Sequence, residues 1–143
     1  MEPPIGLLLL RPIPRYLQDQ LNKRFTVHNY WIYQNQPELL NSISASIRAI
    51  VRDVKNPVDA NLIDSLPKLE IVSNLGVGVD RIDLEKCKQM GIRVTNTPHV
   101  LSDEVADTTI ALILAALRRI VSANRFVRDG QWVNRDFLLT TKV

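Results

Sequence analysis

Two closely spaced glycines, Gly76 and Gly78, follow an apolar run that ends at Leu75. A turn of this composition leaves backbone N–H groups unshielded by side chains, so a small anion such as a carboxylate can reach them. The same spacing also serves a plain strand exit, because glycine is a common turn residue. Two interpretations, a carboxylate-binding turn and a purely structural turn, are open at this point.

A dinucleotide-binding loop is another use of paired glycines, and the sequence argues against it. Such a loop needs a third glycine three residues after the second, at the start of a helix, and an acidic residue about 20 residues further on. Position 81 is Arg81, and Asn96 stands where the acid is expected. We therefore expect no pyrophosphate loop at this turn.

Alternating strand and helix patterns surround the glycines. Apolar or β-branched runs predict five strands, at residues 5–10, 26–33, 47–51, 69–75 and 92–95. Helical spacing and helix-terminal residues predict four helices between them, at residues 14–25, 37–43, 59–66 and 83–90. This alternation predicts an α/β fold with a parallel, doubly wound sheet.

The loops that follow parallel strands gather at one edge of such a sheet, which is where ligands bind. The loops at Arg11, at Arg52 and Asp53, at residues 76–80 and at residues 96–99 are expected there. The glycine turn therefore lies where a site should be, and the two interpretations of it become equal alternatives.

A long helix is predicted from Asp103 to about Asp129. At ~1.5 Å per residue it would span about 40 Å, more than the sheet beside it needs. Residues 110–117, IALILAAL, are apolar on every side, and such a helix must be covered on more than one side. We expect the covering surface to come from a second domain, a second subunit or both.

Composition excludes several classes of protein. The net charge of +3 is spread through the 143 residues, which is weak support for nucleic-acid binding. The single cysteine, Cys87, forms no internal disulfide, and its lysine neighbours give no metal site. No apolar run approaches the roughly 20 residues of a membrane-spanning helix, and the start of the chain lacks the basic residues of a signal peptide. We expect a cytoplasmic protein that binds no nucleic acid, membrane or metal.

Asp53 after the third predicted strand raises the possibility of a phosphorylation-receiver domain. Receivers also need an acidic pair after the first strand to bind Mg²⁺. That place holds Arg11 and Pro12, so this interpretation is disfavoured.

Residues 76–120, GVGVDRIDLEKCKQMGIRVTNTPHVLSDEVADTTIALILAALRRI, resemble the D-isomer-specific 2-hydroxyacid dehydrogenases. They are most similar to the plant hydroxypyruvate, glyoxylate and hydroxyphenylpyruvate reductases, as are residues 6–25 and the pair Tyr30–Trp31. The resemblance implies a substrate-binding domain at residues 1–101, with a flavodoxin-like sheet of about five strands. It implies that residues 102–143 form a long linking and dimerisation helix with a tail, and that the nucleotide-binding domain is absent from this chain.

The resemblance also implies roles for individual residues. By the matching motif, the amides of Val77 and Gly78 hold the substrate carboxylate, while Leu75 and Gly76 shape the turn. Val77, Val105 and Thr109 match positions that border the NADP or NAD cofactor in relatives.

Catalytic residues are not assigned to this chain. The arginine, glutamate and histidine that act in the family, and its glycine-rich nucleotide fingerprint, match no part of the 143 residues. His28 and His99 are expected to be structural or surface residues. Arg52 is a candidate for the mouth of the substrate site, although a solvated arginine at a strand end is the favoured interpretation.

The function implied is that of the N-terminal part of an NAD(P)H-dependent reductase of small 2-oxoacids such as hydroxypyruvate or glyoxylate, inactive alone. The alternative is a truncated, non-catalytic module that associates with full-length subunits through the helix at residues 103–129. A homodimer or such an association is the expected assembly.

Overall fold

The computed structural model describes residues 5–138 and 140. The chain divides into two compact units, Met1–Pro98 and His99–Val143, and each is treated by itself. The last residues of the predicted tail, 141–143, lie outside the described part of the chain.

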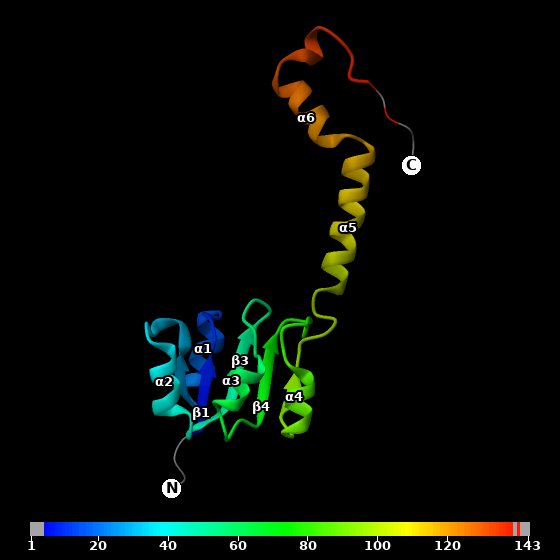
Figure 1. Cartoon of the computed structure of the whole chain (residues 1–143). Coiled ribbons are helices and arrows are strands. Elements are labelled where there is room, and N and C mark those ends of the chain that lie inside the picture. The colour runs from blue at the N-terminus through cyan, green and yellow to red at the C-terminus, as the bar shows by residue number, and fades with distance from the viewer. Residues whose placement is uncertain (1–4, 139, 141–143) are drawn as a thin grey trace. The chain divides into compact units, whose positions relative to one another are not determined.

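A five-stranded parallel sheet forms the centre of the first unit (Figure 1). Its strands, in chain order, are β1 (Gly6–Leu9), β2 (Thr26–Asn29), β3 (Ile47–Asp53), β4 (Ile71–Leu75) and β5 (Arg93–Thr95). Their spatial order, β2-β1-β3-β4-β5, is the doubly wound order of flavodoxin-like folds. The predicted fold class is confirmed, and all five strand ends meet at one edge.

The helices between the strands are α1 (Arg15–Asn22), α2 (Gln36–Ile43), α3 (Ala60–Asp64) and α4 (Leu84–Gln89). Helices α2, α3 and α4 each begin with a side-chain N-cap. Asn35, Asp59 and Asp83 each accept a hydrogen bond from the backbone N–H three residues on. Such N-caps satisfy donors that the helix itself leaves free and so fix where each helix begins.

The second predicted strand is shorter than expected. β2 ends at Asn29, and Tyr30–Ile32 form a 3-10 turn, η1. Asn29 is the register partner of Leu9, where β1 ends. Because β2 is an edge strand, the residues beyond Asn29 have no neighbouring strand to pair with, and β propensity alone does not extend it.

The main hydrophobic cluster of the first unit lies on one face of the sheet. Leu8, Ile50 and Val72 from three adjacent strands are fully buried there, together with Ile63 and Cys87 from α3 and α4. Successive strand residues point to opposite faces, so Leu7 and Leu9, also buried, belong to the other face. β1 is therefore covered on both sides, which explains its unbroken apolar sequence.

Two helices, not one, make up most of the second unit. α5 spans Ser102–Leu117 and α6 spans Ile120–Arg128, followed by the 3-10 turn η2 (Gln131–Val133). The prediction of one helix to Asp129 is therefore wrong. Arg119 adopts a left-handed conformation, with φ of 52°, and ends the first helix. No glycine or proline marks this break in the sequence.

Aromatic packing accompanies the break. The Phe126 ring from α6 lies edge-on to the rings of Trp132 and Phe137, at centroid distances of 6.5 and 5.4 Å. The Arg119 guanidinium lies 5.3 Å from the centre of the Phe137 ring. Of these contacts, the one between Arg119 and Phe137 joins the break itself to the ring cluster.

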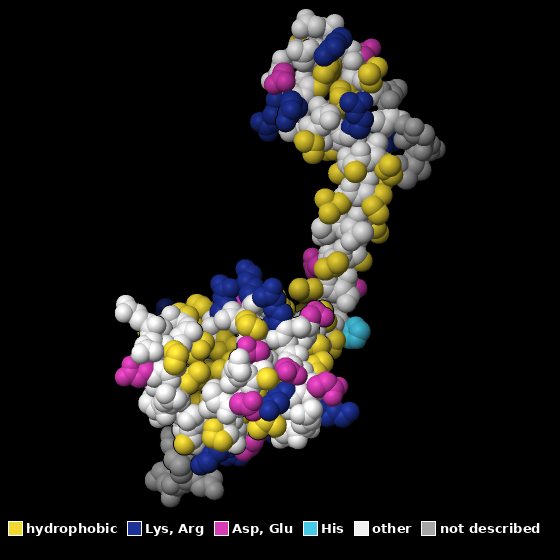
Figure 2. All heavy atoms as spheres, in the orientation of Figure 1, with side chains coloured by type: hydrophobic (Ala, Val, Ile, Leu, Met, Phe, Trp, Pro, Cys, Tyr) yellow, Lys and Arg dark blue, Asp and Glu magenta, His cyan; other side chains and the backbone are white. Residues whose placement is uncertain are grey.

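α5 has no buried residue within the chain. Figure 2 shows hydrophobic side chains along its length, and Leu112 is 65% exposed. None of the helices in the described part of the chain is long and apolar enough to cross a membrane. Within the same residues, no group of three or more His, Cys, Asp or Glu side chains could hold a metal ion.

Candidate functional site

The turn after β4 has all three of its carbonyl groups engaged by neighbouring groups. The Asn74 side-chain amide donates to Gly76 O at 2.7 Å and to Gly78 O at 3.0 Å. The Asn96 side-chain amide donates to Val77 O at 2.9 Å, and the Thr97 N–H donates to Gly76 O at 3.1 Å. All three carbonyl groups of residues 76–78 are thus held by hydrogen bonds from within the first unit.

Two N–H groups of the same turn, unlike its carbonyl groups, have no hydrogen-bond partner among the described residues. Within the described residues, the N–H groups of Val77 and Gly78 donate to no protein acceptor. Val77 is 60% exposed, so its amide is on the surface of the unit. Two adjacent free N–H groups at a surface turn form a small site of positive potential that suits an anion.

Loops on both sides hold the turn in place. After β5, Asn96 and Thr97 bind its carbonyl groups. On the other side, Val58 N–H donates to Arg81 O at 2.8 Å, and the Arg81 guanidinium donates to Lys55 O at 3.1 Å. The segment that follows β4 is therefore anchored between the loop after β3 and the loop after β5.

Gly76 is required by the shape of the turn. Its φ is 148°, a region that residues with a side chain rarely adopt. A Cβ at this position would lie 2.5 Å from Cγ1 of Val54, which is far inside van der Waals contact. Gly78 is less restricted, because its Cβ would meet only the Asp80 carboxylate, at 3.3 Å.

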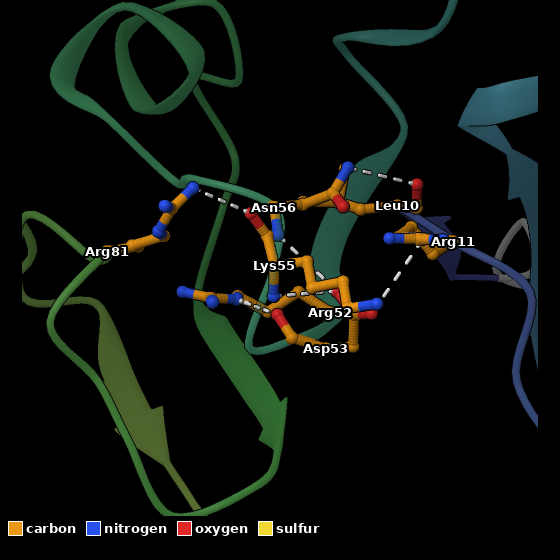
Figure 3. Close-up of polar contacts among 7 residues, drawn as sticks. All are labelled: Leu10, Arg11, Arg52, Asp53, Lys55, Asn56 and Arg81. Carbon is orange, nitrogen blue, oxygen red and sulfur yellow. Dashed lines mark hydrogen bonds and ion pairs between the residues drawn. The ribbon is translucent and has the colours of Figure 1, made fainter.

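A second group of polar residues lies where β1 and β3 end, at the point where the strand order reverses (Figure 3). The Asp53 carboxylate lies 3.8 Å from Arg11 and accepts the N–H groups of Lys55 and Asn56. The Asn56 amide donates to Leu10 O at 3.4 Å. Asp53 thus closes the loop after β3 and pairs with Arg11.

Arg52 is buried, and the favoured prediction of a solvated arginine is wrong. Only 1% of it is exposed, and its Nε donates to Asp53 O at 2.5 Å. Burial lowers the pKa of its guanidinium; Asp53 opposes this shift and Arg81 adds to it. Arg52 is the register partner of Asn74, one strand away from the turn. Its position at the end of a strand gave no indication of this burial.

Three buried side-chain atoms in this part of the sheet have no hydrogen-bond partner within the described residues. They are Nη1 and Nη2 of Arg52 and Oδ1 of Asn74. Two are donors and one is an acceptor, on residues paired in register across β3 and β4. Figure 2 shows Lys and Arg side chains gathered at the edge of the sheet where the strands end.

Two open pockets lie near η1, α2 and α3, with volumes of about 340 and 270 Å³. Tyr30, Asp59 and Leu62 line both of them. Burial raises the pKa of the Tyr30 hydroxyl, and Asp59 raises it further. Asp59 is already used as the N-cap of α3. Neither pocket includes a residue of the glycine turn.

The remaining predicted site residues lie in the second unit. Val105 and Thr109 are exposed on α5, and the Thr109 hydroxyl donates to Val105 O at 2.7 Å, one helical turn back. Their role beside a cofactor is not tested by this geometry and stays a prediction.

The two histidines are in different settings. His28 is in β2, where burial lowers the pKa of its imidazole and favours the neutral form. His99 is exposed and has a left-handed φ of 66°. Neither lies in the turn at residues 76–78.

Comparison with known proteins identifies the family. Residues 7–140 match the family model of the D-isomer specific 2-hydroxyacid dehydrogenase catalytic domain. Over 138 residues the chain is 51% identical to hydroxyphenylpyruvate reductase of Plectranthus scutellarioides and 50% identical to glyoxylate/hydroxypyruvate reductase A HPR2 of Arabidopsis thaliana. Each match covers 96% of this chain and 44% of the relative.

Solved structures give the same result. The fold matches a 2-hydroxyacid dehydrogenase from Ketogulonicigenium vulgare Y25 with a TM-score of 0.91 and 36% identity, over 98% of this chain and 44% of that one. An NADPH-dependent glyoxylate/hydroxypyruvate reductase from Sinorhizobium meliloti, in complex with NADP and malonate, matches with a TM-score of 0.77 and 30% identity, over 99% of this chain and 43% of that one. The chain thus spans less than half the length of these relatives, and it belongs to the D-isomer specific 2-hydroxyacid dehydrogenase family.

Proposed function

We propose that this chain provides the carboxylate-binding part of a reductase for small 2-oxoacids of the glyoxylate or hydroxypyruvate type. The observation that carries the proposal is the arrangement of the turn at residues 76–78. Its carbonyl groups accept hydrogen bonds from Asn74, Asn96 and Thr97, and the N–H groups of Val77 and Gly78 donate to no protein acceptor among the described residues. Two adjacent N–H donors suit the two oxygens of a carboxylate, and hydrogen bonds to a charged acceptor are the stronger kind.

Anchoring the carboxylate also places the reacting atom. In a 2-oxoacid the keto carbon is bonded directly to the carboxylate carbon. Holding the carboxylate at Val77 and Gly78 therefore restricts the keto group to a few orientations above the turn, which lowers the entropy cost of the reaction. Leu75, which is 39% exposed, and Gly76 give the turn its shape.

NADP or NAD is the proposed hydride source, because the relatives named above include an NADPH-dependent reductase bound to NADP. The reduced nicotinamide, when bound, supplies the hydride that the keto carbon accepts. The residues of this chain fit that cofactor only in part. The five glycines, at positions 6, 76, 78, 91 and 130, form no Gly-X-Gly-X-X-Gly sequence, so only Val77, Val105 and Thr109 are proposed to border it.

A binding experiment tests the proposal on the 143-residue chain. Hydroxypyruvate and dihydroxyacetone differ only in that a hydroxymethyl group replaces the carboxylate. We expect ligand-detected NMR to show binding of hydroxypyruvate and none of dihydroxyacetone at the same concentration. Equal binding of the two compounds, or of neither, would overturn the proposal. Because no pyrophosphate loop is present in these 143 residues, we also expect no reduction of hydroxypyruvate when NADPH is added.

A second function, association with another subunit, is favoured by α5. This 16-residue helix has no buried residue in the chain. Six of its large apolar side chains are at least 44% exposed: Val105, Ile110, Leu112, Ile113, Leu114 and Leu117. Exposed apolar surface of this kind marks protein contacts. We propose that α5 packs against a second copy of the chain or against a full-length homologue. Sedimentation equilibrium should detect the dimer, and Leu112→Asp should abolish it. The proposal would be contradicted if the chain were a monomer at all concentrations and did not co-purify with the homologue.

A further inference from the structure

We propose that Asn74 and Asn96 are positioning residues that orient the turn for binding a carboxylate. The inference rests on the proposed function, because it assigns to these two side chains the task of making the Val77 and Gly78 amides available. Neither side chain is proposed to touch the ligand.

Asn74 acts from beneath the turn. It is 1% exposed, and its single Nδ2 group serves two carbonyls, Gly76 O and Gly78 O. Only the NH₂ end of the amide can donate to two carbonyl oxygens, so the orientation of this side chain is fixed by its contacts. Its hydrogen bonds bracket Val77 on both sides, which determines how the two peptide planes of the turn are tilted.

Asn96 acts from the side. Its Nδ2 donates to Val77 O, the one carbonyl of the turn that Asn74 does not reach. The backbone N–H of its neighbour Thr97 donates to Gly76 O. The loop after β5 therefore adds a second support, on an exposed residue that contributes little to the core.

The peptide plane links these contacts to the ligand. Each N–H is rigidly opposed to the carbonyl of the preceding residue, because the peptide group is planar and trans. Holding Gly76 O fixes the direction of the Val77 N–H, and holding Val77 O fixes that of the Gly78 N–H. The residues that bind these two carbonyls are thus the ones that direct the two free donors outward.

Isosteric substitutions separate this role from packing. Asn74→Asp and Asn96→Asp keep the side-chain shape but replace the donor with an acceptor facing a carbonyl oxygen. Asn56→Asp is the matched control, because Asn56 Nδ2 also donates to a backbone carbonyl at this edge, Leu10 O, but outside the turn. We expect hydroxypyruvate affinity to fall by about threefold to tenfold in each variant. Asn74→Asp weakens the hold on Gly76 O, which Thr97 still binds, and Asn96→Asp releases Val77 O. Asn56→Asp should bind like the wild type.

A spectroscopic measurement distinguishes a positioning role from a merely structural one. In the ligand-free chain, the ¹H–¹⁵N signals of Val77 and Gly78 should move in both turn variants, while those of the β-strands stay in place. If the wild type does not bind hydroxypyruvate, the proposed function fails, and the positioning role fails with it. If the wild type binds and the folded Asn96→Asp and Asn74→Asp variants bind equally well, only the positioning role is overturned. Should Asn74→Asp not fold, the exposed Asn96→Asp variant decides the matter alone.

Discussion

Replacing Gly76 by alanine places a methyl group where the turn has no room for one. The backbone at this residue has φ of 148°, and a conformation of this kind costs about 1–3 kcal/mol for a residue with a side chain. The new Cβ would also lie 2.5 Å from Val54 Cγ1, and relieving such an overlap costs about 1–3 kcal/mol more. We therefore expect Gly76→Ala to lower the free energy of unfolding by about 2–5 kcal/mol, a large part of the stability of a domain this size.

Two further variants separate these contributions in urea denaturation followed by far-UV circular dichroism. Gly91 has φ of 68° and open space around its missing Cβ, so Gly91→Ala should show the smaller cost of a left-handed backbone without a clash. Adding Val54→Ala to Gly76→Ala should recover the part that comes from the overlap, since Val54 is 47% exposed and contributes little by itself. A loss below about 0.5 kcal/mol for Gly76→Ala, or no recovery in the double variant, would refute this account of the turn.

Three other predictions concern the scaffold. The Arg48 guanidinium holds the pKa of Glu70 below its usual range. Because the pKa of Glu70 is lower in the folded than in the unfolded chain, Glu70→Gln should destabilise the chain at neutral pH. In urea titrations at a series of pH values, the difference in unfolding free energy between wild type and variant should vanish as the pH falls through the folded-state pKa. Cys87 is 1% exposed, and its thiol pKa is raised by burial and by the nearby Asp83 carboxylate. A thiol reagent should therefore modify it only as fast as the chain opens. Fast reaction of the native protein would contradict its burial. Asp83→Ala should cost about 1 kcal/mol in thermal or urea unfolding by removing the N-cap of α4, and no change would mean that the cap is not formed in solution.

The sheet could be predicted because its strands are strongly patterned. The segments around Leu8, Ile50 and Val72 are apolar runs bounded by helix signals, and they form the buried strands of the sheet. The strand ends were also placed at the right edge, because a parallel sheet brings them together by topology.

Features that depend on tertiary contacts were missed. The break at Arg119 has no glycine or proline to announce it, and it is accompanied by a ring cluster that includes Phe137, 18 residues further on. The burial of Arg52 follows from its place beside Asn74 in the sheet, which no local pattern records.

The glycine turn lies between these two cases. Its composition left two interpretations open, a site for a small anion and a purely structural turn. The hydrogen bonds that orient it come partly from Asn96, on the loop after the next strand. Only the folded chain brings that side chain to Val77. The residue types therefore allowed a carboxylate site at this turn, and the structure was needed to propose how the donors are presented.

The central claim is that the amides of Val77 and Gly78 hold the carboxylate of a small 2-oxoacid. Titration of the ¹⁵N-labelled 143-residue chain with hydroxypyruvate, followed by ¹H–¹⁵N correlation spectra, tests it most directly. The account predicts saturable shifts that are largest at Val77 and Gly78, with one dissociation constant for both. Saturable shifts centred on other residues, with these two amides unchanged, would contradict it.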